Sequence, residues 1–94
     1  MKPENLIWLP DIVDKLIDKH QVEPDEVEEV FLNRPRIFRG PKGHYPGEDV
    51  YYALGRTETG RHLFIVFIRK LDGQGLILSA RDMTVKERRR FGRK

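Results

Sequence analysis

The sequence predicts a small α+β domain: two helices, then a three- to four-stranded antiparallel sheet, then one closing helix. Three observations predict this fold class. Apolar residues recur at helical spacing in the first third of the chain, follow strand spacing in the middle, and give way to a helix-start signal near the end. A chain of 94 residues holds one modest core, so we expect a single domain over residues 1–94.

The first third of the chain contains two helix patterns. The stretch Asp11–His20 is amphipathic, and its apolar side is formed by Ile12, Val13, Leu16 and Ile17. Pro24 begins a second helix, because proline fits the first helical position and acidic residues directly follow it. The apolar run Leu6–Leu9 before the first helix is either a brief strand or a packed lead-in, and Pro10, which follows it, is well placed at the first turn of that helix.

The middle of the chain predicts strands joined by loops and turns. Residues 34–49 form the main surface loop, in which Arg36–Arg39 is a candidate short strand. The next stretch has the period-two spacing of a strand, in which Val50, Tyr52 and Leu54 alternate with Tyr51, Ala53 and Gly55. The unbroken apolar run Leu63–Ile68 predicts a central strand that is buried on both faces, and Leu76–Ala80 predicts the strand that follows it in the sheet.

The closing helix is predicted from a capping box. The Thr84 hydroxyl can accept a hydrogen bond from the Glu87 N–H, while the Glu87 carboxylate reaches back to the Thr84 N–H. Directly before this box, Arg81 follows an apolar strand, so we expect its side chain to be held at the edge of the core.

Charge is distributed unevenly along the chain. Residues 1–33 contain nine acids and three lysines, a net charge of −6, whereas residues 34–94 contain fifteen bases and six acids, a net charge of +9. Such a division suits a basic face that binds a polyanion beside an acidic face that repels it. The alternative is that these charges are solvated surface groups.

Several classes of function are poorly supported by the sequence. The chain has no cysteine, which excludes a disulfide framework and a thiolate site, and its three histidines lack metal-binding spacing, so we expect neither a metal nor a cofactor. Ser79 is the only serine and no nucleophile motif surrounds it. We see no signal peptide or membrane-spanning run, and therefore expect a cytoplasmic protein.

Arginine is the residue type that points to chemistry. Guanidinium groups stay charged and hold phosphate in bidentate fashion, so several of them on one sheet surface suit an RNA backbone or a phosphoryl transition state. The arginines at strand ends or in hairpins are Arg56, Arg61, Arg69 and Arg81. We expect RNA contacts from Arg88, Arg89, Arg69 and Lys70.

Two further positions could transfer protons. Lys19 and His20 end the first helix, where they either offset the helix dipole or face the arginines as proton-transfer groups. Glu48 or Asp49, at the entry to the first long strand, is either a general base or an exposed acid without chemistry.

The order and spacing of these residues resemble the BrnT-like toxins of bacterial type II toxin-antitoxin modules. The most specific motif runs from Leu78 to Thr84, with Glu87, Arg88 and Phe91 at fixed spacing behind it. Further similarity extends over nearly the whole chain, at Trp8, Lys19-His20, Val22–Phe31, Gly47-Glu48-Asp49, Leu54-Gly55-Arg56 and Gly60-Arg61.

The resemblance implies a RelE-like fold and an endoribonuclease that cleaves RNA, inhibits translation and needs no metal. It assigns the family's functional positions to Lys19, His20, Glu48, Arg56, Arg61 and Arg81. It also implies a BrnA-like, DNA-binding antitoxin from the adjacent gene, and it allows a toxin dimer within a hetero-oligomer.

The sequence departs from the family at five positions. Relatives commonly have Asp, Lys, Asn, Gly and Arg where this chain has Leu9, Ile12, Leu16, Gln21 and Val50. Because the missing Lys and Arg would help to neutralise a phosphate, an alternative stays open: a weakened or inactive relative that binds nucleic acid or protein.

Overall fold

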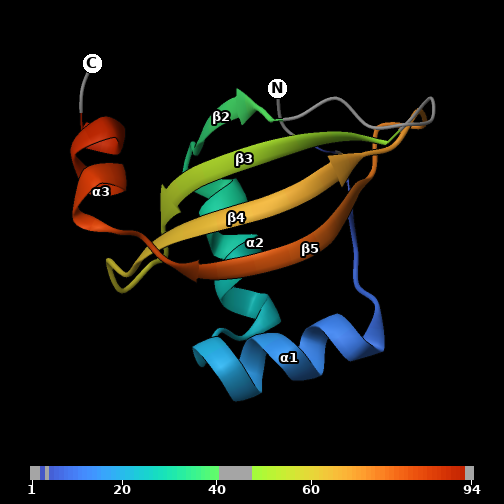
Figure 1. Cartoon of the computed structure of the whole chain (residues 1–94), viewed down its shortest axis with the longest axis horizontal. Coiled ribbons are helices and arrows are strands. Elements are labelled where there is room, and N and C mark those ends of the chain that lie inside the picture. Colours follow the sequence, from blue (N-terminus) through green and yellow to red (C-terminus); the bar gives the residue numbers. More distant parts are fainter. Residues whose placement is uncertain (1–2, 4, 41–47, 93–94) are drawn as a thin grey trace.

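One five-stranded sheet with three helices makes up the part of the chain that the structure, a computed structural model, describes: residues 3, 5–40 and 48–92 (Figure 1). The helices are α1 (Pro10–His20), α2 (Pro24–Leu32) and α3 (Val85–Gly92). The strands are β1 (Leu6–Ile7), β2 (Arg36–Arg39), β3 (Asp49–Arg56), β4 (His62–Arg69) and β5 (Gly75–Asp82), in the spatial order β1-β5-β4-β3-β2. The predicted α+β class and the three helices are confirmed.

The predicted sheet, with three or four antiparallel strands, is wrong in strand number and in one pairing. The run before α1 contributes β1, which pairs parallel with β5 through Leu6 opposite Gly75 and Ile7 opposite Leu76. The brief-strand alternative for this run is therefore confirmed. A two-residue strand is too short to show a period-two pattern, and its parallel direction depends on where the later strand lies, which local sequence does not reveal.

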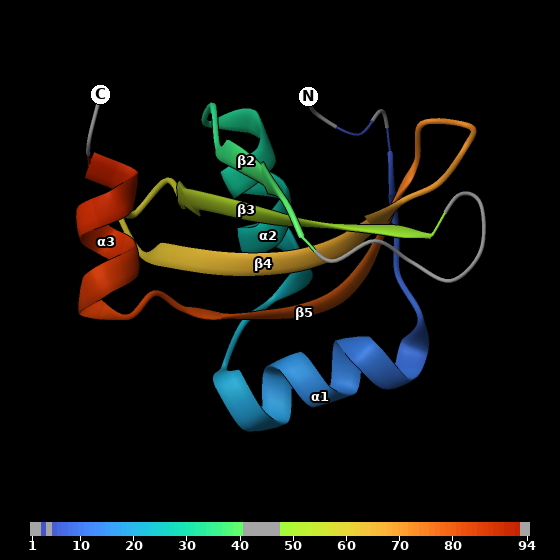
Figure 2. The ribbon, with the colours of Figure 1, turned by 45° about the horizontal axis from the view of Figure 1, so that its top comes forward.

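Both N-terminal helices pack on the same face of the sheet (Figure 2). Each begins with proline at the first turn, as predicted, and α2 also has a capping box in which the Glu23 N–H donates to Glu26 Oε1 at 3.0 Å. The core between helices and sheet is formed by Leu16, Val22, Val27, Val30, Phe31, Ala53, Leu63, Ile65, Phe67, Ile77 and Ala80.

The central strand β4 is buried fully on one face only. Leu63, Ile65 and Phe67 point toward the helices and are at most 1% exposed, whereas Phe64 and Val66, which alternate with them, are half-buried on the other face. The prediction that both faces of this strand are buried is wrong, because α1 and α2 lie together on one side of the sheet. Its other side is left largely accessible.

The short strand and loop of residues 34–49 are described in part. Arg36–Arg39 is confirmed as a strand, and it pairs antiparallel with β3 as the edge of the sheet. The breaker-rich stretch that the sequence assigns to a surface loop includes residues 41–47, which lie outside the described residues.

The closing helix α3 starts from the predicted capping box. The Thr84 N–H donates to Glu87 Oε1 at 2.8 Å, and the Glu87 N–H donates to Thr84 Oγ1 at 3.2 Å. All eight residues of α3 are described and none of their side chains is fully buried. The helix stands at one end of the sheet in Figure 1, away from α1 and α2. In the described part of the chain, no helix is long and apolar enough to span a membrane.

Close packing of α2 against β3 requires glycine at position 55. A Cβ at Gly55 would come within 2.6 Å of Val30 Cγ1 and 3.3 Å of Pro35 Cβ. We predict that Gly55→Ala lowers the free energy of unfolding by about 1–3 kcal/mol in chemical denaturation, because the core must shift to admit the methyl group.

The matched control is Gly92→Ala, where an added Cβ meets nothing within 4 Å. This change should leave stability unchanged or raise it by up to about 1 kcal/mol, because alanine favours helix. Equal effects of the two substitutions would contradict the packing argument.

Candidate active site

The end of β5 sends neighbouring side chains to opposite faces of the sheet. Ala80 is buried against the helices, so strand alternation puts Asp82 on the helix side and Arg81 on the other side. We call the side away from α1 and α2 the open face. Its strand residues include Phe38, Tyr52, Phe64 and Arg81, which the strand register places on the same side.

Arg81 lies on the open face in a fixed position. Its guanidinium carbon is 4.3 Å from the centre of the Phe64 ring, a cation–π contact. Two of its nitrogens donate to the Glu87 carboxylate at 2.8 and 2.9 Å. This pairing raises the pKa of Arg81 and lowers the pKa of Glu87, so both groups are charged and neutralise one another. Arg81 is held at the edge of the fold, as predicted. The group that holds it is the Glu87 carboxylate of α3.

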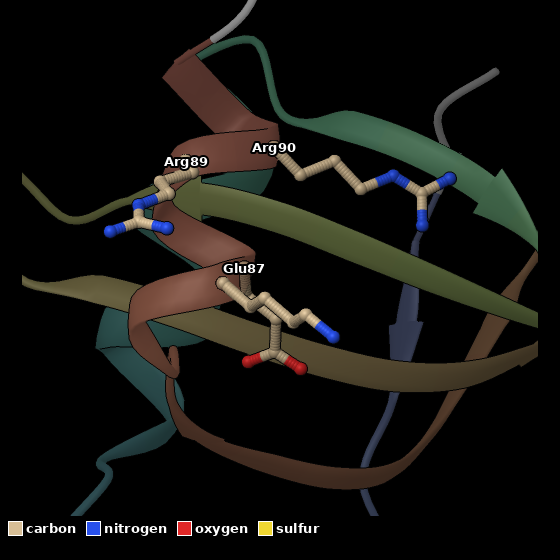
Figure 3. Close-up of a pocket in the computed structure, with 4 residues that line it drawn as sticks. Glu87, Arg89 and Arg90 are labelled. Atoms are coloured by element: carbon tan, nitrogen blue, oxygen red, sulfur yellow. The ribbon is translucent and has the colours of Figure 1, made fainter.

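Aromatic rings and further arginines continue across the open face. The Tyr52 and Phe64 rings lie 5.1 Å apart, and the Arg90 guanidinium carbon lies 3.8 Å from the centre of the Phe38 ring. Figure 3 shows Arg90 reaching from α3 over the sheet, beside Glu87, while Arg89 points to the other side of the helix. Lys86, Glu87, Arg89 and Arg90 line a groove of about 480 Å³ here. Alternating cations and rings can hold phosphates and stack bases.

A second hollow lies where β3, β4 and α3 meet. Arg56 and His62 are opposite one another on neighbouring strands, and α3 adds Arg88, Arg89 and Phe91. The His62 and Phe91 rings are 5.8 Å apart, edge to face. Partial burial and the charges of Arg88 and Arg56 lower the pKa of His62 below its ordinary value of 6.5, so its imidazole is largely neutral at pH 7.

Arg61 lies on the helix side and is tightly held there. It donates to the Asp82 carboxylate at 2.7 and 3.2 Å and to Glu26 Oε1 at 3.2 Å. It also donates to the backbone carbonyls of His20 at 2.9 Å and Gln21 at 2.7 Å. These bonds join the turn before β4 to the ends of both N-terminal helices, so Arg61 acts as a structural clamp.

The six predicted catalytic residues do not form one cluster. Lys19 and His20 end α1 on the helix side, near Arg61, whereas Arg56 and Arg81 lie on the open face. Glu48 directly precedes β3 and Arg56 ends it, which separates them by about 26 Å at roughly 3.3 Å per residue. Arg61 and Arg81 therefore extend from opposite faces of the sheet, and Glu48 and Arg56 lie at opposite ends of β3.

The predicted RNA-binding residues also divide into two groups. Arg88 and Arg89 belong to α3 and line the hollow beside Arg56. Arg69 and Lys70 lie at the opposite end of the sheet, where Arg69 is opposite Asp49 in the strand register.

The sequence alone did not identify His62 as a residue of the open face, and it did not identify the ion pair between Glu87 and Arg81. His62 stands two residues before Phe64, so strand alternation alone could have placed it on the same face. Glu87 was assigned only to the capping box, because its contact with Arg81 depends on how α3 folds back over the sheet. Asp82, the partner of Arg61, was likewise given no role. Among the described residues, no group of three or more His, Cys, Asp or Glu side chains could hold a metal ion.

Comparison with known families identifies the chain. Residues 8–87 match the family described as "Ribonuclease toxin, BrnT, of type II toxin-antitoxin system". This match confirms the resemblance that the sequence motifs predicted. No curated protein matches the chain.

The clamp around Arg61 makes a prediction about stability. We expect Arg61→Ala to lower the free energy of unfolding by about 1–3 kcal/mol, because it removes the partner of Glu26 and of two backbone carbonyls. Arg39→Ala is the control, since its ion pair with Asp49 is exposed and such pairs contribute about 0–1 kcal/mol. Equal destabilisation by both variants in urea unfolding would show that Arg61 is not a clamp.

Proposed function

Since the chain belongs to the BrnT family of ribonuclease toxins of type II toxin-antitoxin systems, we propose that it cleaves RNA without a metal ion and thereby inhibits translation. The observation that carries this proposal is the chemistry of the open face. Arg81 covers Phe64, Arg90 covers Phe38, and Arg56 and Arg88 line the hollow beside them. Such a face offers phosphate contacts and stacking surfaces side by side.

In this mechanism an RNA strand lies across the open face beside α3. Arg56 and Arg81 contact successive phosphates, and bases stack on guanidinium planes or on the Tyr52 ring. The 2′-hydroxyl attacks the adjacent phosphorus, the bond to the 5′-oxygen breaks, and the products carry a 2′,3′-cyclic phosphate and a 5′-hydroxyl. Arginine charge near the phosphate supplies the electrostatic stabilisation that a metal supplies in other nucleases.

The remaining candidate residues from the sequence take other roles in this proposal. Arg61 positions the start of β4 through its hydrogen bonds. Lys19 and His20 form the end of α1 that Arg61 holds. Glu48, Arg69 and Lys70, at the far end of the sheet, attract the flanking RNA or lie outside its path.

One observation favours a second function, a binding module without catalysis. Arg81 and Arg61 each carry a carboxylate partner, so neither offers an unpaired positive charge to a phosphate. Together with the five departures from the family pattern, this pairing suits a protein that binds RNA or a partner weakly and cleaves nothing.

A toxin of this family implies an antitoxin partner. We propose a BrnA-like, DNA-binding protein that covers the open face and α3, so that RNA and antitoxin compete for the same surface. A toxin dimer within the hetero-oligomer fits this arrangement. Mass measurement of the complex with the adjacent gene's product gives the stoichiometry, and undiminished RNA binding by that complex would contradict a shared surface.

The test of catalysis uses the purified protein with a messenger RNA fragment in the presence of EDTA. We expect defined cuts with 5′-hydroxyl ends, and we expect Arg81→Ala to slow cleavage by about 10²-fold or more, since it removes a phosphate contact and leaves the Glu87 carboxylate unpaired beside the RNA. Arg39→Ala, on a different part of the sheet, should cleave as the wild type does.

Intact RNA after incubation with the wild-type protein would contradict the enzyme. If that RNA is bound with an affinity that falls steeply with salt, the binding module is the correct function.

A further inference from the structure

We infer that His62 is the general base of this protein, acting in the hollow that β3, β4 and α3 enclose around Arg56 and Arg88. The inference rests on the proposed ribonuclease function and deepens it. His62 is not among the positions carried over from the family, and the acid–base candidates among those positions, Lys19, His20 and Glu48, lie away from the hollow.

The hollow has a composition suited to one RNA phosphate. Its volume is about 550 Å³, and its lining consists of Arg56, His62, Val85, Arg88, Arg89, Phe91 and Gly92. No carboxylate is among these described lining residues. This distinguishes the hollow from the surroundings of Arg61 and Arg81, whose charges are already neutralised. An incoming phosphate meets three guanidinium groups and displaces no salt bridge that holds the fold.

The imidazole of His62 is oriented by its surroundings. A backbone hydrogen bond with Gly60 holds the ring from the turn before β4, and it raises the pKa of His62, which partly offsets the lowering by burial and by the arginines. The Phe91 ring packs edge to face against it from α3. The backbone carbonyl of His62 accepts from the Met83 N–H at 3.1 Å, so the strand that carries the ring is also anchored to the end of β5.

The charged groups around His62 favour its neutral form. Arg56 comes from β3, and Arg88 and Arg89 come from α3. Partial burial lowers the pKa of His62, and the charges of Arg88 and Arg56 lower it further. A general base must be unprotonated to accept a proton, so these cations keep His62 competent at neutral pH while they bind the phosphate.

The chemical step balances without a cofactor. The free nitrogen of His62 takes the proton of the 2′-hydroxyl, the 2′-oxygen forms a bond to phosphorus, and the bond from phosphorus to the 5′-oxygen breaks. Water protonates the leaving 5′-oxygen, and the imidazolium returns its proton to solvent.

The experiment compares single-turnover cleavage of one messenger RNA fragment by wild type, His62→Gln and His62→Ala. We expect His62→Gln to cleave at least about 10²-fold more slowly than the wild type. Its affinity for the same fragment made with 2′-O-methyl groups should be unchanged. The wild-type rate should fall as pH drops below 6.5, because His62 becomes protonated, and this acidic limb should be lost in His62→Gln. Added imidazole should restore cleavage by His62→Ala. Lys15→Gln, an exposed change on α1, is the control.

Each outcome bears on one claim. Wild-type cleavage that His62→Gln leaves intact, with the same pH profile, overturns the role of His62 and keeps the ribonuclease. Loss of cleavage in His20→Gln, with full activity in His62→Gln, would put the general base on the helix side and would also overturn the role of His62. Slow cleavage by His62→Ala that imidazole does not restore would make His62 structural. Absence of cleavage by the wild type refutes the function itself, and the inference with it.

Discussion

The alternation of side chains at the end of β5 is the constraint on which both sides of the sheet depend. Arg81 and Asp82 are consecutive, so a strand must send them to opposite faces. Asp82 binds Arg61, which in turn holds the backbone at the ends of α1 and before α2. Arg81 binds Glu87, which holds the first turn of α3 over the open face. One strand end therefore positions the helices that form the core and the helix that borders the candidate site.

The division of charge along the sequence becomes a division between faces. The acidic first third forms α1 and α2, which cover one side of the sheet. The arginines of the candidate site come from β3, β5 and α3 and lie on the other side. A polyanion is repelled by the helix side and attracted to the open face, which is the surface on which we propose that RNA binds.

Local signals in the sequence predicted most of the elements correctly. Proline before an acidic turn marked α1 and α2, and the Thr84–Glu87 box marked α3, because each signal involves residues within one helical turn. Strand β1 stayed ambiguous, since it exists only through its pairing with residues about seventy positions away. Burial of β4 on both faces was a wrong inference, because an apolar run does not reveal whether a second layer of helices covers it.

The candidate site was less predictable than the fold for a related reason. Residue types and family positions identified Arg56 and Arg81, but which cations share a surface depends on strand register. That register separates Glu48 from Arg56 by the length of β3 and puts Arg61 behind the sheet. His62 emerges only once α3 is in place, because Arg88 and Phe91 complete its surroundings.

The central claim is that RNA binds the open face, and NMR titration with a short 2′-O-methyl RNA tests it most directly. This RNA lacks the attacking hydroxyl, so it binds without being cleaved. We expect the amide signals of Tyr52, Phe64, Arg81 and α3 to shift together, while those of α1 and α2 stay in place. Shifts centred on Lys19, His20 and Arg61, with the open-face signals unchanged, would contradict it.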